Sequence, residues 1–129
     1  MEEALVAYML AGTSLAALVG TRINWVQSPQ GSASPRIVLY KISGLRDMCM
    51  DGPTGFVSTR IQADCIGLTY ASAKATARAL EARISGYAGT TGGVRFEGIF
   101  LIGERDDFND ADTPDKLFRT SLDFNLWHK

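Results

Sequence analysis

The sequence predicts an α+β domain: a mostly antiparallel sheet of about five strands, with helices packed on one face and a projecting β-hairpin arm. Residues 56–68 alternate between apolar and polar side chains, which is typical of a strand with one packed face. Thr69 can then cap a helix over residues 70–87, whose apolar residues recur at helical spacing. Turn residues at 51–55 separate two long strand patterns and indicate the arm.

Length and charge narrow the class of protein. The 129 residues fit one domain, 1–129. Thirteen basic residues against fourteen acidic ones argue against a protein that binds nucleic acid by neutralising phosphates, so we expect no sequence-specific nucleic-acid partner. The apolar stretch 5–19 begins after two glutamates and is broken at Gly12, so it predicts neither a signal peptide nor a membrane span.

The N-terminal third predicts two short helices and two strands. Glycines at 12 and 20 end the helices, which we expect to form a layer on the core. A short strand follows at 22–27, then a loop rich in serine and proline at 28–35, then a strand at 36–44.

Residues 45–56 connect this strand to the long one and form the predicted arm. The methionines at 48 and 50 need cover, and two alternatives are open: the arm folds back on its own domain, or it packs on another subunit. On the polar face of the long strand lie Ser58, Arg60, Gln62 and Asp64.

The C-terminal third predicts two more strands. A glycine-rich connection at 88–93 leads into a strand at 94–102 that places Phe96 and Phe100 on one face. Apolar residues at 99 and 101 on the other face indicate a strand covered on both sides at that end. Residues 104–116 form a predicted acidic loop, and 117–127 the last strand.

No motif in the chain indicates catalysis, a cofactor or a metal ion. His128 is the second-last residue, where a fraying terminus positions a side chain poorly, and the two cysteines have no histidine near them in sequence. The acidic run 106–112 lacks the spacing of an EF-hand loop. A looser divalent site, a solvated loop and an acidic surface for a partner remain alternatives for it. We therefore expect a protein that is not an enzyme.

Nearly the whole chain resembles the tail completion or tail terminator proteins of long-tailed phages, and in particular the version found in the gene transfer agents of alphaproteobacteria. The resemblance lies in these segments, in order: LAALVGTRIN, SPRIVLYKISG, MDGPTG, RIQADCIGLTYASAKATARALEARI, GIFLIGERDDF and LFRTSLDFNLWHK. It implies a structural role and carries no catalytic residues.

The resemblance implies a hexameric ring at the head-proximal end of the tail tube. Such a ring stops tube polymerisation, contacts the tube protein and the neck or stopper protein of the capsid, and lets DNA pass through its centre. It implies assembly in the bacterial cytoplasm and a place in a phage-like particle. The resemblance favours contact of the arm with a neighbouring subunit, and the arm residues in question are Arg46, Asp47, Met48, Met50 and Asp51.

Two further surfaces are candidates for contacts. One is the polar face of the long strand, at Arg60, Gln62 and Asp64. The other is the acidic loop, at Asp106, Asp107 and Asp110, which would face a neighbour, the axial channel or solvent. The alternatives to a tail terminator are another head–tail connector or a tail-tube subunit, and a small ligand-binding domain with a pocket near Asp64, Cys65 and Tyr70.

Overall fold

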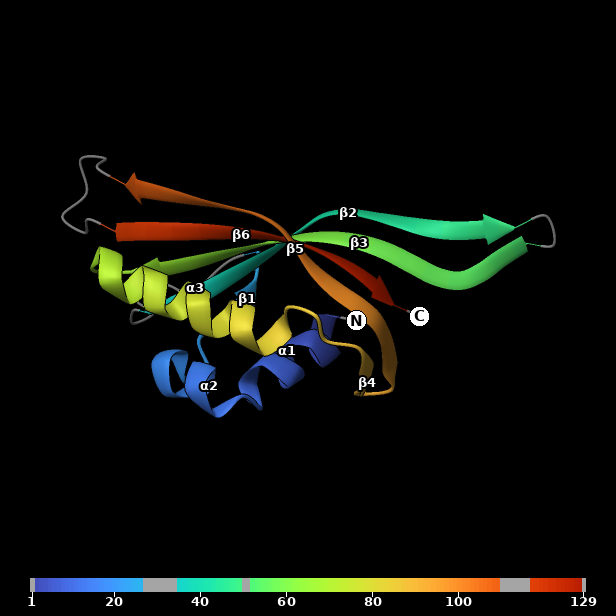
Figure 1. Cartoon of the computed structure of the whole chain (residues 1–129), viewed down its shortest axis with the longest axis horizontal. Helices are drawn as coiled ribbons and strands as arrows, with labels where there is room; N and C mark the ends of the chain where they lie inside the picture. The colour runs from blue at the N-terminus through green and yellow to red at the C-terminus, as the bar shows by residue number, and fades with distance from the viewer. Residues whose placement is uncertain (1, 27–34, 50–51, 110–116, 129) are drawn as a thin grey trace.

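The computed structural model describes residues 2–26, 35–49, 52–109 and 117–128. It contains three helices and six strands in these residues (Figure 1). In chain order they are α1 (Glu2–Leu10), α2 (Thr13–Val19), β1 (Ile23–Trp25), β2 (Arg36–Cys49), β3 (Gly52–Gly67), α3 (Tyr70–Ile84), β4 (Gly89–Thr91), β5 (Val94–Asn109) and β6 (Leu117–His128).

The strands form one sheet in the order β1-β2-β3-β6-β5-β4. All neighbours are antiparallel except β1 and β2, which run parallel. The predicted α+β class is confirmed, but the sheet has six strands because β4 lies where the sequence predicted a flexible connection. Gly92 and Gly93, with φ of 58° and 78°, make the tight turn that returns the chain from β4 into β5.

The predicted strand-to-helix unit is confirmed. The Thr69 hydroxyl accepts a hydrogen bond from the backbone N–H of Ser72 at 3.1 Å and so caps α3. The helix buries a stripe of alanines, leucine and isoleucine against the sheet. At the end of β3, a Cβ added to Gly67 would lie 2.8 Å from the backbone nitrogen of Ala73, so only glycine fits beneath the first turn of α3. The buried residues of the helix are Ala73, Thr76, Ala77, Leu80 and Ile84.

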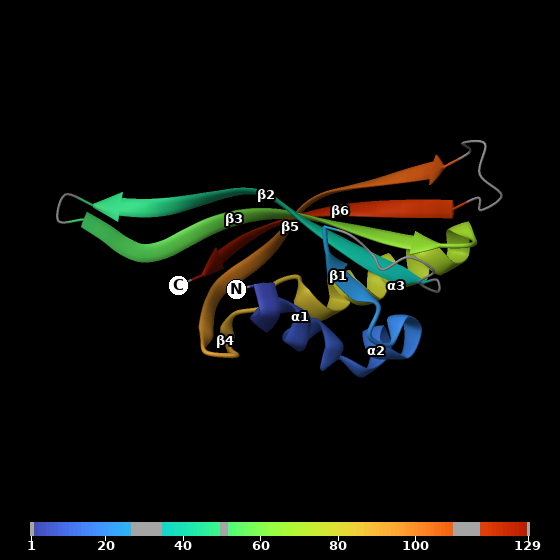
Figure 2. The same ribbon diagram turned by 180° about the vertical axis from the view of Figure 1, so that it is seen from behind.

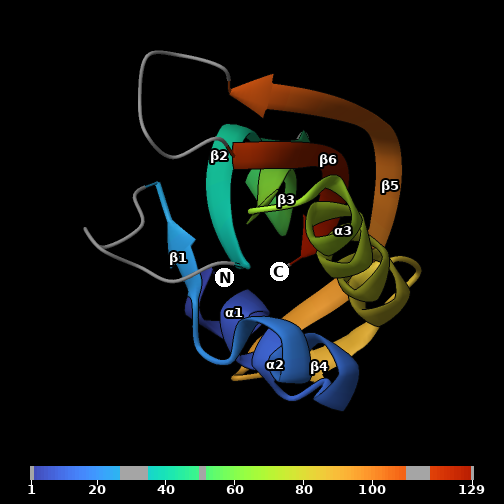
Figure 3. The same ribbon diagram turned by 90° about the vertical axis from the view of Figure 1, so that its left-hand side faces the viewer.

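The sheet curls around the helices, which all lie on its concave side (Figure 3). The core therefore fills the space between α1, α2, α3 and the inner faces of β2, β3, β5 and β6. Arg83 on α3 joins two of these helices, because its Nε donates to the Tyr8 carbonyl of α1 at 2.9 Å and its guanidinium lies 3.8 Å from the centre of the Tyr8 ring. The convex face of the sheet has no helix over it in the described part of the chain.

Helices α1 and α2 are separate elements. The chain bends by 94° between them. Among the described residues, no single helix is long and apolar enough to cross a membrane, although α1 and α2 taken together would meet that test of length and composition.

Two irregularities in β5 overturn the predicted alternation of that strand. The register with β6 shifts between Phe96 and Gly98 and again between Leu101 and Gly103. Phe96 is fully buried, as predicted, but after the first shift the odd-numbered residues turn inward and Phe100 points to the open face. The prediction that Phe96 and Phe100 share one face is therefore wrong, since each extra residue changes the face of every residue after it.

Candidate interaction surfaces

The arm is a two-stranded ribbon that continues beyond the rest of the sheet (Figures 1 and 2). Pairing between β3 and β6 ends at Val57 and His128, whereas β2 and β3 stay paired as far as Cys49 and Gly52. A two-stranded ribbon is only marginally stable in water. The predicted arm residues Arg46, Asp47 and Met48 lie in the β2 half of this ribbon, and Met50 and Asp51 lie outside the described residues.

The convex face of the sheet carries a polar network centred on Asp64. Although no helix covers this face, the Asp64 side chain is almost fully buried, because side chains from β6 and β3 enclose it. Its Oδ1 accepts hydrogen bonds from Ser121 Oγ at 2.7 Å and Gln62 Nε2 at 2.9 Å. Arg119 Nη1 lies 3.8 Å from Oδ2. The carboxylate therefore ties β3 to β6 from the open side.

The other two predicted residues of this face, Arg60 and Gln62, lie beside Asp64 in β3. Arg60 Nη2 contacts Asp123 Oδ2 at 3.3 Å, with the arginine side chain about half exposed. Gln62 Oε1 accepts from Arg105 Nη2 at 3.4 Å, a long contact that joins β3 to β5 across β6. The structure thus brings the three predicted residues together on one surface, in a network that also includes residues of β5 and β6.

Sequence reasoning missed an apolar patch on the same face. Phe100, Ile102 and Trp127 are 55%, 53% and 40% exposed. The Phe100 ring lies over Gly98, where an added Cβ would be 2.8 Å from the ring, and Gly98 is the register partner of Trp127. The prediction that this end of β5 is covered on both sides is wrong for a single copy, because no described residues cover its convex side. The patch follows from the two register shifts in β5, and the alternation of apolar and polar residues in the sequence gives no sign of these shifts.

The acidic stretch is a strand for half of its length. Glu104 to Asn109 belong to β5, so the predicted loop 104–116 is wrong for those residues. Asp106 accepts hydrogen bonds from Lys74 of α3, Thr120 of β6 and Tyr70. Lys74 also contacts Glu104. The ammonium group lowers the pKa of Asp106, and both carboxylates raise the pKa of Lys74, so this end of α3 is tied to β5 by ion pairs. Asp107 lies in β5, and Asp110 lies outside the described residues.

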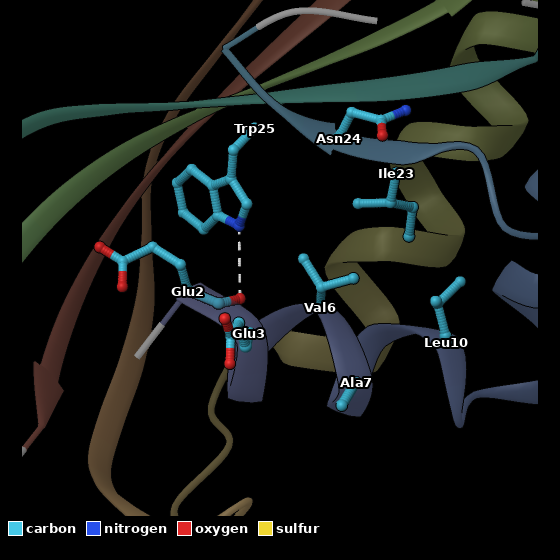
Figure 4. Close-up of a pocket in the computed structure, with 8 residues that line it drawn as sticks. All are labelled: Glu2, Glu3, Val6, Ala7, Leu10, Ile23, Asn24 and Trp25. Atoms are coloured by element: carbon cyan, nitrogen blue, oxygen red, sulfur yellow. Dashed lines mark hydrogen bonds between the residues drawn. The ribbon is translucent and has the colours of Figure 1, made fainter. Parts of the chain in front are cut away.

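A groove runs between α1 and the edge strand β1 (Figure 4). Its volume is about 430 Å³, and its lining is mostly apolar. Trp25 Nε1 donates to the Glu2 carbonyl at 3.3 Å and holds the indole against the start of α1. A 2.6 Å ion pair with Lys41 lowers the pKa of the Glu2 carboxyl to about 2. The lining residues are Glu2, Glu3, Val6, Ala7, Leu10, Ile23, Asn24 and Trp25.

The titratable groups of the chain do not form a reaction centre in the described residues. Asp64 and Cys65 are consecutive in β3, so they face opposite sides of the sheet, and Tyr70 lies at the exposed start of α3. The pocket imagined for these three residues is therefore not formed. Burial raises the pKa of the Cys65 thiol. No group of three metal-ligating side chains gathers in the described ranges.

His128 is better held than its place near the end of the chain suggests. It lies in the last pair of β6 with β3 and is largely buried. Its Nε2 is 2.9 Å from Thr59 Oγ1. Burial lowers the pKa of the imidazole, so the ring is kept neutral in the folded chain. The expectation of a fraying terminus at this residue is wrong.

Residues 3–129 match the family described as "Tail completion protein gp17". The chain belongs to the tail completion protein family. Its place is therefore the tail of a phage-like particle, as a structural component. No curated protein matches the chain.

Several solved structures share the fold. One is a chain of "Virion of native gene transfer agent (GTA) particle", with a TM-score of 0.81, 20% sequence identity, and coverage of 99% of this chain and 93% of that one. A second solved chain has a TM-score of 0.53 and 17% identity, with coverage of 98% and 95%. At these identities the likeness establishes the fold of this tail completion protein.

Proposed function

We propose that this tail completion protein forms a hexameric ring that caps the head-proximal end of a tail tube. The ring stops polymerisation of the tube and joins the tail to the neck of the capsid. One observation carries the proposal: the arm of β2 and β3 projects beyond the sheet without a third strand or a helix against it in the described chain. Such a ribbon gains stability when another chain covers it.

The arrangement of surfaces favours a closed ring over a symmetric dimer. The arm lies at one end of the molecule, and α1 and β1, whose residues line the groove, lie away from it (Figures 1 and 2). A contact between two different patches repeats from subunit to subunit, and it forms a closed ring when the rotation that relates neighbouring subunits adds up to a full turn. We propose the arm residues 46–51 as the main subunit contact, and Arg60, Gln62 and Asp64 of the convex face as a second one.

The partners follow from the same proposal. One end of the ring meets the tube protein, the other meets the neck or stopper protein, and DNA passes through the centre. The acidic residues Asp106, Asp107 and Asp110 would face one of these partners or the channel. The particle is a phage or a gene transfer agent, a reading supported by the fold match to a gene transfer agent virion. The chain has no catalytic role in this proposal.

Native mass spectrometry over a concentration series, followed by negative-stain imaging, tests the proposal. A hexamer with a central hole, formed alone or on tube ends, supports it. Open filaments of one chain would instead favour a tail-tube subunit, because a contact that does not close builds a helix. A chain that stays monomeric both alone and with purified tubes would refute the ring.

The arm is tested by the double substitution of Met48→Asp and Met50→Asp. The expected product is a folded monomer that forms no ring. The matched control places the same charge on the far side of the molecule, with Ala17→Asp and Ala71→Asp at exposed helical positions, and should leave the ring intact. Rings that survive the arm substitutions would show that the arm is not the contact.

A further inference from the structure

The groove between α1 and β1 lies beside a strand with one open side. β1 is the last strand of the sheet on its side and pairs only with β2 among the described strands. Such an edge presents backbone N–H and C=O groups that can pair with another chain. The residues of β1 also line the groove, so a strand added here would lie directly along it.

The far wall of the groove suits the side chains of an added strand. Alternate side chains of that strand would point toward α1, where Val6, Ala7 and Leu10 present an apolar surface. Val6 and Leu10 are partly buried, and Ala7 is exposed. The acidic side chains of the lining, Glu2 and Glu3, belong to the start of α1, and Asn24 lies between Ile23 and Trp25 in β1. An extended apolar segment fits this surface better than a small polar ligand does.

The residue after β1 gives an independent sign of a surface built for contact. Val26 has a φ of 67°, which β-branched residues rarely adopt, and its side chain is 66% exposed. Its backbone N–H donates to the Leu39 carbonyl at 2.7 Å, which holds the strained residue in place. Strain of this kind persists where the surrounding structure fixes it, and such places gather at binding sites.

The arm supplies a segment of the right chemistry within the same chain. Its sequence places Met48, Cys49 and Met50 between charged residues. Although β2 and β3 shift register between Arg46 and Met48, neither outer edge of the ribbon pairs with another described strand beyond Val57. It cannot reach the groove of its own chain. β1 pairs at Leu39, and the ten residues from there to Cys49 extend about 33 Å at about 3.3 Å per residue, directed away from β1.

We propose that the arm of one copy adds to the β1 edge of the next copy and fills the groove between its β1 and α1. This contact rests on the proposed ring and names the site that receives the arm. Because the arm and the groove are different patches, each copy contributes one arm and receives one. The contact therefore repeats head to tail from copy to copy.

Disulfide cross-linking tests the contact in the full-length chain. Ala7→Cys adds a thiol to the lining of the groove, and the native Cys49 supplies a thiol on an incoming arm. Successive residues of a strand face opposite sides, so position 48 faces the groove if position 49 does not. Ala7→Cys is therefore also combined with Met48→Cys and Cys49→Ser. Cys65 is buried with a raised pKa, so it does not compete. The control is Ala17→Cys, at an exposed position of α2 outside the groove.

The expected result is a ladder of disulfide-linked oligomers from Ala7→Cys that the control does not give, with the chain alone or with purified tail tubes. Loss of the ladder in Ala7→Cys with Cys49→Ser, which has no thiol on the arm, would complete the assignment. Rings without this cross-link overturn the contact and leave the proposed function standing. If neither rings nor cross-links form, with the chain alone or with tail tubes, both the contact and the proposed function are overturned. A cross-link from position 7 to the tube subunit, identified by mass spectrometry, overturns the second copy as the occupant.

Discussion

Replacing Asp64 by alanine should destabilise the chain more than its place on the open face of the sheet suggests. The side chain is 4% exposed and accepts two hydrogen bonds, from Ser121 at 2.7 Å and from Gln62 at 2.9 Å. A buried hydrogen bond to a charged acceptor contributes about 1.5–3 kcal/mol, and the donor left behind stays unsatisfied. Ser121 is itself buried, whereas Gln62 is half-buried and regains water, so we expect a total loss of about 3 kcal/mol.

The matched control is Asp123→Ala on the same face. Asp123 pairs with Arg60 at 3.3 Å, but the arginine side chain is 48% exposed, so this ion pair should contribute less than about 1 kcal/mol. Asp64→Asn, which keeps the shape and one acceptor oxygen, should lie between the two.

Urea unfolding followed by circular dichroism measures the difference. At a slope of about 2 kcal/mol per molar urea, Asp64→Ala should lower the midpoint by about 1.5 M. The protein concentration is kept where the midpoint does not depend on it, because assembly adds apparent stability. Equal midpoints for the two alanine variants would refute the reasoning, since burial of the carboxylate would then have no energetic consequence.

Three further outcomes are expected. Gly67→Ala should lower the free energy of unfolding by about 1–3 kcal/mol because the new methyl group meets the backbone of Ala73, while Gly103→Ala, with open space around it, should change it far less; urea midpoints compare the two. The stability that neutral His128 contributes should be present above its unfolded-state pKa near 6.5 and be lost as pH falls toward its lowered folded-state pKa. His128→Gln should therefore flatten this part of the stability–pH curve. An unchanged curve would exclude the imidazole as the source of the pH dependence. Cys65, in a variant whose other cysteine is serine, should not react with a thiol reagent until the chain unfolds; rapid labelling of the native chain would contradict the burial.

The sequence was sufficient for the elements with regular periods. The alternation through Ile61 and Ala63 located β3, and the cap at Thr69 located the start of α3, because a single register runs through each. The interior of β5 was not predictable. Its two shifts change which residues face the core, and a shift depends on the partner strand and not on the strand itself.

The surfaces were predictable to different degrees. The alternation placed Arg60, Gln62 and Asp64 on one face, and the turn residues indicated the arm. Burial of Asp64 was not predictable, because it depends on Ser121 and other β6 residues that are distant in sequence. The groove was missed for a similar reason, since it exists only where α1 lies beside β1.

The position of β6 has a consequence for the synthesis of the protein. This strand is the last of the described strands to leave the ribosome, yet it lies in the middle of the sheet and pairs with both β3 and β5. Until residues 117–128 emerge, no strand joins β3 to β5, and the contacts of β6 with β3, β5 and α3 cannot form. The emergence of residues 117–128 thus sets the earliest moment at which a copy can fold and join a particle, and chains interrupted before β6 lack the strand that unites the sheet.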